Sequence, residues 1–285
     1  MFWILLTIFF ATRNSMIDFT LRKYRELLMA LQKKGYKFIT FEQYCTYTDY
    51  SLGGTPSHIH KYIILRHDVD LKAQNSLATA QIEQELGIAA SYYFRVVPES
   101  NQPEVIRAIA DLGHEIGYHY EDMAIAHGDV EKAYAHFQEQ LAYFRTYYLV
   151  RTICMHGAPT SQWDGKELWK KYNYRDLGII GEPYFDVDFG QVFYLTDTGR
   201  CWDGYKVSVR DKIPVYQDQW NAQGLVYHAT DDIIQAVEQG SLPPRIMITT
   251  HPQRWTDNRR AWVKEIMIQN VKNVIKRLII KIKGH

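Results

Sequence analysis

Short apolar runs alternate with segments of helical periodicity along most of this chain of 285 residues. The run from Tyr62 to Leu65 is apolar and rich in β-branched residues, which is typical of a central parallel strand covered on both faces. Apolar spacing predicts helices at 18–34, 71–86, 103–112 and 129–148. Further strands are predicted at 90–97, within 113–123, and at 152–155, 177–180, 191–195, 206–209 and 245–250. This alternation predicts an α/β fold with a parallel sheet.

Four of the predicted strands end in ionisable residues. The first ends in Asp68 and Asp70, and the others end in His119, His156 and His251. Active sites of α/β folds lie off the carboxyl ends of their strands, so these side chains are expected to converge on one face of the sheet. The structural alternative for Asp70 is that it caps the next helix.

A metal site explains this convergence economically. Imidazole and carboxylate groups suit zinc or another divalent first-row metal, and a catalytic site keeps one coordination position open for water. We therefore expect one divalent metal, with zinc as the preferred ion. Six other histidines are expected at the surface or in structural hydrogen bonds: His58, His60, His127, His136, His228 and His285.

The net charge limits the classes of binding partner, and the cysteine content indicates the cellular compartment. The net charge of +1 argues against nucleic acid as a partner, because no basic excess is present to neutralise phosphates. The three cysteines are odd in number and far apart, which fits a reducing compartment better than a disulfide-bonded secreted domain. A cytoplasmic location is expected.

Residues 60–255 resemble the polysaccharide deacetylases with a NodB-like domain, carbohydrate esterase family 4. The pair Asp68 and Asp70, the run Gly113–Gly117 before His119, and His251 carry this resemblance. It implies a single distorted (β/α)7-type barrel with its active site at the C-terminal ends of the strands. It also implies that Asp68 is the general base, that Asp70 and His119 bind the metal, and that His251 is the general acid.

One position departs from the family pattern. The family supplies a second histidine ligand four residues after the first, and this chain has Met123 there. A thioether is a poor zinc ligand beside carboxylates and imidazole. Glu121 or Asp122 is the preferred substitute because of proximity, His156 comes next, and His127 is a further alternative. A metal held by Asp70, His119 and waters alone also stays open.

The implied substrate is an N-acetylated sugar. The segments 196–200 and 250–255 resemble a branch of the family associated with surface-polysaccharide biosynthesis. Arg200, Arg210 and Arg254 are expected to pair with aspartates or to clamp an acidic sugar. Trp255 is sized to stack on a sugar ring, and burial in the core is the alternative.

The resemblance implies a metal-dependent hydrolase that removes an N-acetyl group from a sugar of a surface polysaccharide or its precursor. The reaction hydrolyses a carbon–nitrogen bond that is not a peptide bond. The first alternative is a non-catalytic carbohydrate-binding barrel that has lost a metal ligand. A glycoside hydrolase that uses Asp68 and Glu121 ranks last, because it leaves the histidines unexplained.

The two ends of the sequence bear on where in the cell the protein is located. Residues 1–15 are expected to be a short apolar leader or the product of a start codon assigned too early, with 16–285 forming one domain. Apolar residues recur at helical spacing over 262–282, and lysines and arginines crowd the end of that stretch. A helix that covers the barrel is the preferred interpretation. The alternative is weak contact with an anionic membrane surface.

Overall fold

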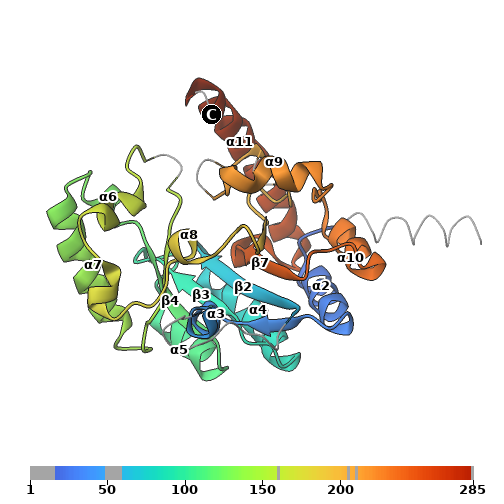
Figure 1. Ribbon diagram of the computed structural model, residues 1–285, viewed down its shortest axis with the longest axis horizontal. Helices are drawn as coiled ribbons and strands as arrows, with labels where there is room; N and C mark the ends of the chain where they lie inside the picture. Colours follow the sequence, from blue (N-terminus) through green and yellow to red (C-terminus); the bar gives the residue numbers. More distant parts are fainter. Residues whose placement is uncertain (1–16, 49–59, 159–160, 204–205, 209–210, 284–285) are drawn as a thin grey trace, which may run out of the picture.

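The computed structural model describes residues 17–48, 60–158, 161–203, 206–208 and 211–283 (Figure 1). Within these residues, seven strands form one parallel sheet in the order β5-β4-β3-β2-β7-β6, with β1 beside β2, and the sheet curls into a half-barrel. The strands are β1 (Lys37–Ile39), β2 (Tyr62–Val69), β3 (Ser91–Phe94), β4 (Glu115–Tyr120), β5 (Ile153–Met155), β6 (Phe193–Thr196) and β7 (Arg245–Thr250). The predicted α/β barrel-type fold is confirmed.

Helices connect the strands and cover the outside of the sheet (Figure 1). The α-helices are α2 (Leu21–Lys33), α3 (Phe41–Thr48), α4 (Ala73–Glu85), α5 (Pro103–Asp111), α6 (Asp122–Ile125), α7 (Val130–Phe144), α8 (Pro183–Asp186), α9 (Pro214–Ala222), α10 (Thr230–Gln239) and α11 (Arg259–Lys283). The 3₁₀ helices are η2 (Gly165–Lys170), η3 (Tyr174–Leu177) and η5 (Pro252–Arg254). Helices α2, α4, α5 and α7 lie where the apolar spacing predicts them.

Strand β2 is the centre of the sheet, and each of its residues is buried. One edge pairs with β7 from Tyr62 to His67. The other edge is shared, because β1 pairs with the first half of β2 and β3 with the second half. Successive side chains of a strand point to opposite faces, so Arg66 and Asp68 face the inside of the curl while His67 faces the helices.

The helix-covered face of β2 holds a buried polar network around Glu83. His67 Nε2 lies 2.7 Å from Glu83 Oε1, and its Nδ1 lies 2.6 Å from Thr250 Oγ1. Tyr92 donates to Glu83 Oε2 at 2.8 Å, and Tyr24 also donates to this carboxylate. Burial by itself raises the pKa of Glu83, but His67 holds this pKa below its usual value. The network links α2 and α4 to the central strands through satisfied polar groups.

Three of the predicted strands differ from the structure. The strand predicted at 177–180 is wrong, because η3 ends there and Gly178 takes a left-handed φ of 72°. The strand predicted at 191–195 is β6 shifted toward its C-terminus. Of the strand predicted at 206–209, residues 206–208 do not form a strand, and position 209 lies outside the described residues. Strand β1 and helix α3 are too short to give a clear periodic signal, and sequence reasoning missed them.

The interpretation of α11 as a covering helix requires correction, because its apolar stripe does not pack on the barrel. Val263, Met267 and Val271 are exposed, whereas Glu265 and Gln269 on the opposite side of the helix are buried. Along the described part of the chain, no helix is long and apolar enough to cross a membrane. The segment 1–15 lies outside the described residues.

Replacing Gly117 by alanine is expected to destabilise the fold. A Cβ on Gly117 would overlap the Tyr93 ring and stand 3.1 Å from the Thr152 carbonyl oxygen, so neighbouring strands would have to move apart. Overpacking of this kind costs about 1–3 kcal/mol in the free energy of unfolding. Urea unfolding measures it, with the exposed Gln84→Ala variant on α4 as a control expected to change stability by less than about 0.5 kcal/mol. Equal stabilities for Gly117→Ala and wild type would contradict the packing described here.

Candidate active site

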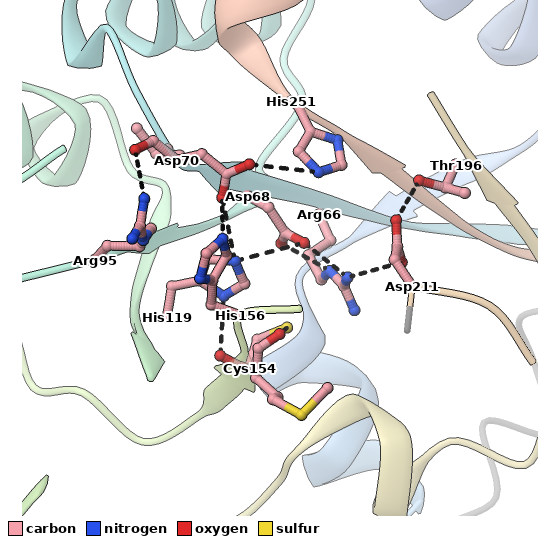
Figure 2. Close-up of polar contacts among 12 residues, drawn as sticks. Arg66, Asp68, Asp70, Arg95, His119, Cys154, His156, Thr196, Asp211 and His251 are labelled. Carbon is pink, nitrogen blue, oxygen red and sulfur yellow. Dashed lines mark hydrogen bonds and ion pairs between the residues drawn. The ribbon is translucent and has the colours of Figure 1, made fainter. Parts of the chain in front are cut away.

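A cavity of about 370 Å³ lies at the C-terminal ends of the central strands. Its polar lining includes side chains from the ends of several strands, together with polar residues from η5 and α11. The principal lining residues are Asp68, Asp70, His119, His156, Asp211 and His251. The predicted convergence of these strand ends is therefore present in the structure (Figure 2).

Three imidazoles surround the carboxylate of Asp70, which follows the end of β2. The Nε2 atoms of His119 and His156 lie 3.5 Å and 3.6 Å from Asp70 Oδ1. His251 Nε2 lies 3.8 Å from Asp70 Oδ2 and approaches from the other side (Figure 2). The histidines come from β4, from the end of β5 and from the end of β7, and β3 separates β4 from β2 in the sheet.

Each of these imidazoles is held through Nδ1 by an acceptor that has no proton to give. The acceptors are the Cys154 carbonyl oxygen at 2.9 Å from His119, Glu121 Oε2 at 2.9 Å from His156, and Asp197 Oδ1 at 2.6 Å from His251. Nδ1 must therefore carry a proton in each ring, which leaves Nε2 as the atom that faces Asp70. Outer partners of this kind fix the tautomer and orientation of metal-binding histidines.

Asp70 has unused capacity to bind a cation. Its Oδ1 is buried and, among the described residues, accepts no hydrogen bond, while Oδ2 accepts from Gln253 Nε2 at 3.2 Å. Burial by itself raises the pKa of Asp70, but the nearby imidazoles hold this pKa well below its usual value. Single donor atoms of Asp70, His119 and His156 all lie within 4.8 Å of one another. This oxygen and nitrogen donor set fits a divalent first-row metal.

A second group of donors meets the same distance criterion but suits a metal less well. It consists of Asp68, His119 and Cys154. Burial raises the pKa of the Cys154 thiol well above its usual value, and a thiol must lose its proton to bind a metal. Asp68 is already committed to an ion pair. We therefore favour the group built on Asp70.

Arg66 fixes the orientation of Asp68 from within the same strand. Its Nε lies 3.0 Å from Asp68 Oδ1, and its NH2 lies 2.9 Å from Oδ2, so the contact is bidentate. The same guanidinium is 4.0 Å from Asp211 Oδ1 (Figure 2). Burial by itself raises the pKa of Asp211, but His251 and Arg66 help to lower this pKa to about 2. Neighbouring hydroxyl groups of Tyr184, Tyr194, Thr196 and Thr198 also donate to Asp211.

Asp197 holds His251 in place and was missed by sequence reasoning. It follows β6, accepts from Arg254 NH1 at 2.6 Å and from Trp255 Nε1 at 2.8 Å, and is fully buried. Burial by itself raises the pKa of Asp197, but Arg254 and His251 hold this pKa below its usual value. Trp255 is also fully buried, so its ring is not available to stack on a sugar. Arg254 lines the cavity while it supports Asp197.

The preferred substitutes for Met123 have other partners. Glu121 forms an ion pair with Arg95 at 2.7 Å and contacts the far side of the His156 ring. Asp122 is buried and contacts His136 instead of Asp70. Met123 is buried in α6. The geometry therefore favours His156 over Glu121 and Asp122 as the third ligand, because the imidazole beside Asp70 and His119 comes from the end of β5.

Two of the arginines expected to bind substrate lie elsewhere or are not described. Arg200 donates to the carbonyl oxygens of Arg254 at 3.0 Å and of Asp18 at 3.4 Å, and its guanidinium lies over the Phe19 ring. These contacts join the chain before α2 to the region around η5. Arg210 lies outside the described residues.

Glu182 is a buried carboxyl behind the end of β5. It accepts from the backbone nitrogen of Met155 at 3.0 Å and from that of Tyr184 at 2.6 Å. Burial raises the pKa of Glu182 to about 7. Because Met155 precedes His156 and Tyr184 lines the cavity, this carboxyl supports one wall of the site.

Comparisons with known proteins give a likeness of fold. No protein-family model and no curated protein matches the chain. Among solved structures, a CE4 family pseudoenzyme from Bacillus anthracis is 13% identical, with a TM-score of 0.42 over 77% of this chain and 63% of that chain. The chain thus spans less than two thirds of that protein. A family 4 carbohydrate esterase from Streptomyces lividans in complex with acetate is 17% identical, with a TM-score of 0.37 over 75% and 89% of the two chains.

The free energy of unfolding of the protein should depend on pH because of the Glu182 carboxyl. Its folded-state pKa is raised from 4.5 to about 7, so its stabilising contribution is full below about pH 4.5 and is lost as the pH rises through 7. Relative to wild type, Glu182→Gln should therefore gain up to about 3 kcal/mol in the free energy of unfolding between pH 5 and 8. Urea unfolding at several pH values measures the difference. Parallel curves for the two proteins would show that Glu182 does not titrate in this range.

Proposed function

We propose that this chain is a metal-dependent hydrolase that removes the N-acetyl group of a sugar. The observation that carries the proposal is the set of three oriented imidazole Nε2 atoms around Asp70, whose buried Oδ1 lacks a hydrogen-bond partner among the described residues. The motif resemblance supports the substrate class, and the neighbouring Asp68 supports the reaction class. The sugar of a surface polysaccharide or its precursor is the substrate that we propose.

Asp70, His119 and His156 would hold the metal, and zinc is the ion we propose. A divalent ion there supplies Lewis acidity and lowers the pKa of bound water. Glu121 supports this arrangement from behind, since its carboxylate holds both the His156 ring and the Arg95 guanidinium. The cavity of about 370 Å³ is within the usual size of small-molecule sites.

Asp68 is positioned to act as the general base. It lines the cavity, and its Oδ2 lies 3.9 Å from His119 Nε2. The bidentate contact with Arg66 prevents rotation of the carboxylate, yet each oxygen retains a lone pair that can accept a proton. Asp68 would accept one proton from the attacking water, whose oxygen forms the new bond to the acetyl carbon.

His251 is positioned to act as the general acid from the neighbouring strand end. Asp197 binds its Nδ1 and thereby directs Nε2 into the cavity, where this nitrogen can give a proton to the leaving amine. Asp197 also faces the positive charge that the ring carries when both nitrogens are protonated. The carbon–nitrogen bond breaks as the amine gains this proton, and the products are acetate and the amino sugar.

The non-catalytic alternative depended on the absence of a second histidine ligand. His156 supplies an imidazole at the required place, so the methionine at position 123 does not by itself remove a ligand. A protein that only binds sugars would also have no need for both Asp68 and His251 in the lining of one cavity. We therefore propose catalysis in preference to binding alone.

Zinc binding tests the ligand assignment. The wild-type protein should bind about one equivalent of zinc, since two imidazoles and a carboxylate make up a common catalytic donor set. His119→Ala and His156→Ala should each lower the zinc affinity at least as much as loss of an outer-shell partner, about 10–100-fold. Metal analysis after dialysis measures this, and the exposed His60→Ala variant is the matched control. Unchanged zinc content in His156→Ala would contradict the assignment.

Acetate release tests the catalytic roles. On N-acetylglucosamine oligomers, Asp68→Asn and His251→Ala should each lower kcat/KM by about 10²–10⁴-fold, because each removes one proton transfer. Asp197→Asn should lower it less and mainly through kcat, since it disturbs the orientation of His251. His60→Ala should keep full activity. Full acetate release by the Asp68 or His251 variant would refute that residue's role.

A further inference from the structure

Helix α11 is amphipathic, but its polarity is the reverse of that expected for a helix that covers a core. Its polar side contacts the protein. Glu265 binds Lys72 at 2.7 Å, and Asn273 donates to the Gly199 carbonyl oxygen at 2.8 Å. Gln269 is buried on the same side, and Trp262 Nε1 donates to the Asp18 carbonyl oxygen at 2.6 Å.

The opposite side of α11 is apolar and exposed. Its large residues are spaced three, four or seven apart, which places them on one side of a helix. They are Val263, Met267, Ile268, Val271, Val274 and Ile275. Met267 is 65% exposed and Val271 is 61% exposed, so the described residues leave this stripe uncovered. In Figure 1 the C-terminal end of α11 rises beyond the other elements, past α9.

The charge of α11 is strongly positive. Its sequence has eight lysine or arginine residues and one acidic residue, Glu265, which is already paired with Lys72. Arg259, Arg260 and Lys264 are exposed near the start of the helix. The basic character of α11 therefore contrasts with the net charge of +1 for the whole chain. An exposed apolar stripe with basic residues around it is the pattern of helices that lie in the plane of an anionic membrane surface.

We propose that α11 is a membrane-contact helix that binds the chain to a bilayer surface rich in anionic lipid. The apolar stripe would enter the boundary between headgroups and acyl chains, and the basic residues would meet the headgroups. The commitment to an anionic surface rests on charge, because a second copy of this helix would bring one basic surface against another. This binding does not depend on catalysis or on the metal.

The position of α11 links this surface to the cavity. Glu265, Gln269 and Lys272 line the cavity, and Ile275 belongs both to the cavity lining and to the apolar stripe. The rim of the cavity thus adjoins the surface that we propose meets the membrane. A sugar that is carried on a lipid would reach the cavity without leaving the bilayer.

Vesicle co-sedimentation of the full chain tests this proposal. Vesicles of phosphatidylcholine with about 30% phosphatidylserine should retain the protein, whereas phosphatidylcholine alone should retain it much less. Binding should weaken as the salt concentration rises from about 0.1 M to about 0.5 M, because the basic residues are exposed. Failure to bind anionic vesicles, or equal binding to both kinds, overturns the proposal.

Variants locate the contact. Met267→Glu with Val271→Glu should lower binding to anionic vesicles about tenfold or more, because the substitutions place charge in the stripe. The control carries the same charge change on exposed positions of α7, Ala135→Glu with Gln138→Glu, and should bind like wild type. Arg260→Gln with Lys264→Gln should weaken binding while it leaves the apolar stripe intact. Circular dichroism checks that each variant is folded.

Two further results would overturn the proposal. Binding that survives both sets of substitutions in α11 would place the contact elsewhere, for example at the apolar start of the sequence. A dimer that dissociates when Met267 and Val271 become glutamate, together with no vesicle binding by wild type, would identify a second copy as the occupant of the stripe. Sedimentation equilibrium distinguishes this case. Zinc content and acetate release should be the same in these variants as in wild type.

Discussion

The structure depends on burying ionisable groups on both faces of one central strand. Strand β2 carries Arg66 and Asp68 toward the cavity and His67 toward the helices, and all three are buried. A buried charge costs free energy unless it is paired and hydrogen-bonded. On the helix side His67 meets Glu83, and on the cavity side Arg66 pairs with Asp68 within the strand itself. Asp70, just beyond the strand, keeps a buried carboxylate oxygen without a hydrogen bond from the described residues.

The parallel arrangement of strands explains why the histidines meet at Asp70. Parallel neighbours present their C-terminal ends at the same edge of a sheet, so β4, β5 and β7 bring His119, His156 and His251 to the end of β2. Each ring is then fixed by a separate acceptor, of which Glu121 and Asp197 are carboxylates. The result is a site whose orientation is set before any ligand binds, which is the condition for effective metal-assisted catalysis.

Sequence reasoning located the strand ends but could not identify the contacts between them. The apolar runs before Asp68 and His251 predicted two central strands and the convergence of their ends. Nearness in sequence favoured Glu121 over His156 as a ligand, yet the fold brings His156 beside Asp70 and leaves Glu121 behind it. Asp197 follows a strand whose position was shifted in the prediction, and within the segment 196–200 only Arg200 was interpreted as a site residue. The periodicity of α11 was visible in the sequence, but periodicity cannot tell which side of a helix faces the protein.

X-ray absorption at the zinc edge of the zinc-loaded protein tests most directly whether Asp70, His119 and His156 hold a divalent metal. We predict nitrogen and oxygen scatterers at about 2.0–2.2 Å, with the multiple-scattering pattern of two imidazoles and without sulfur. In the His156→Ala variant, any zinc that remains should show one imidazole fewer. A sulfur scatterer at about 2.3 Å would contradict this ligand set, because it would place Cys154 in the metal site in place of the proposed ligands.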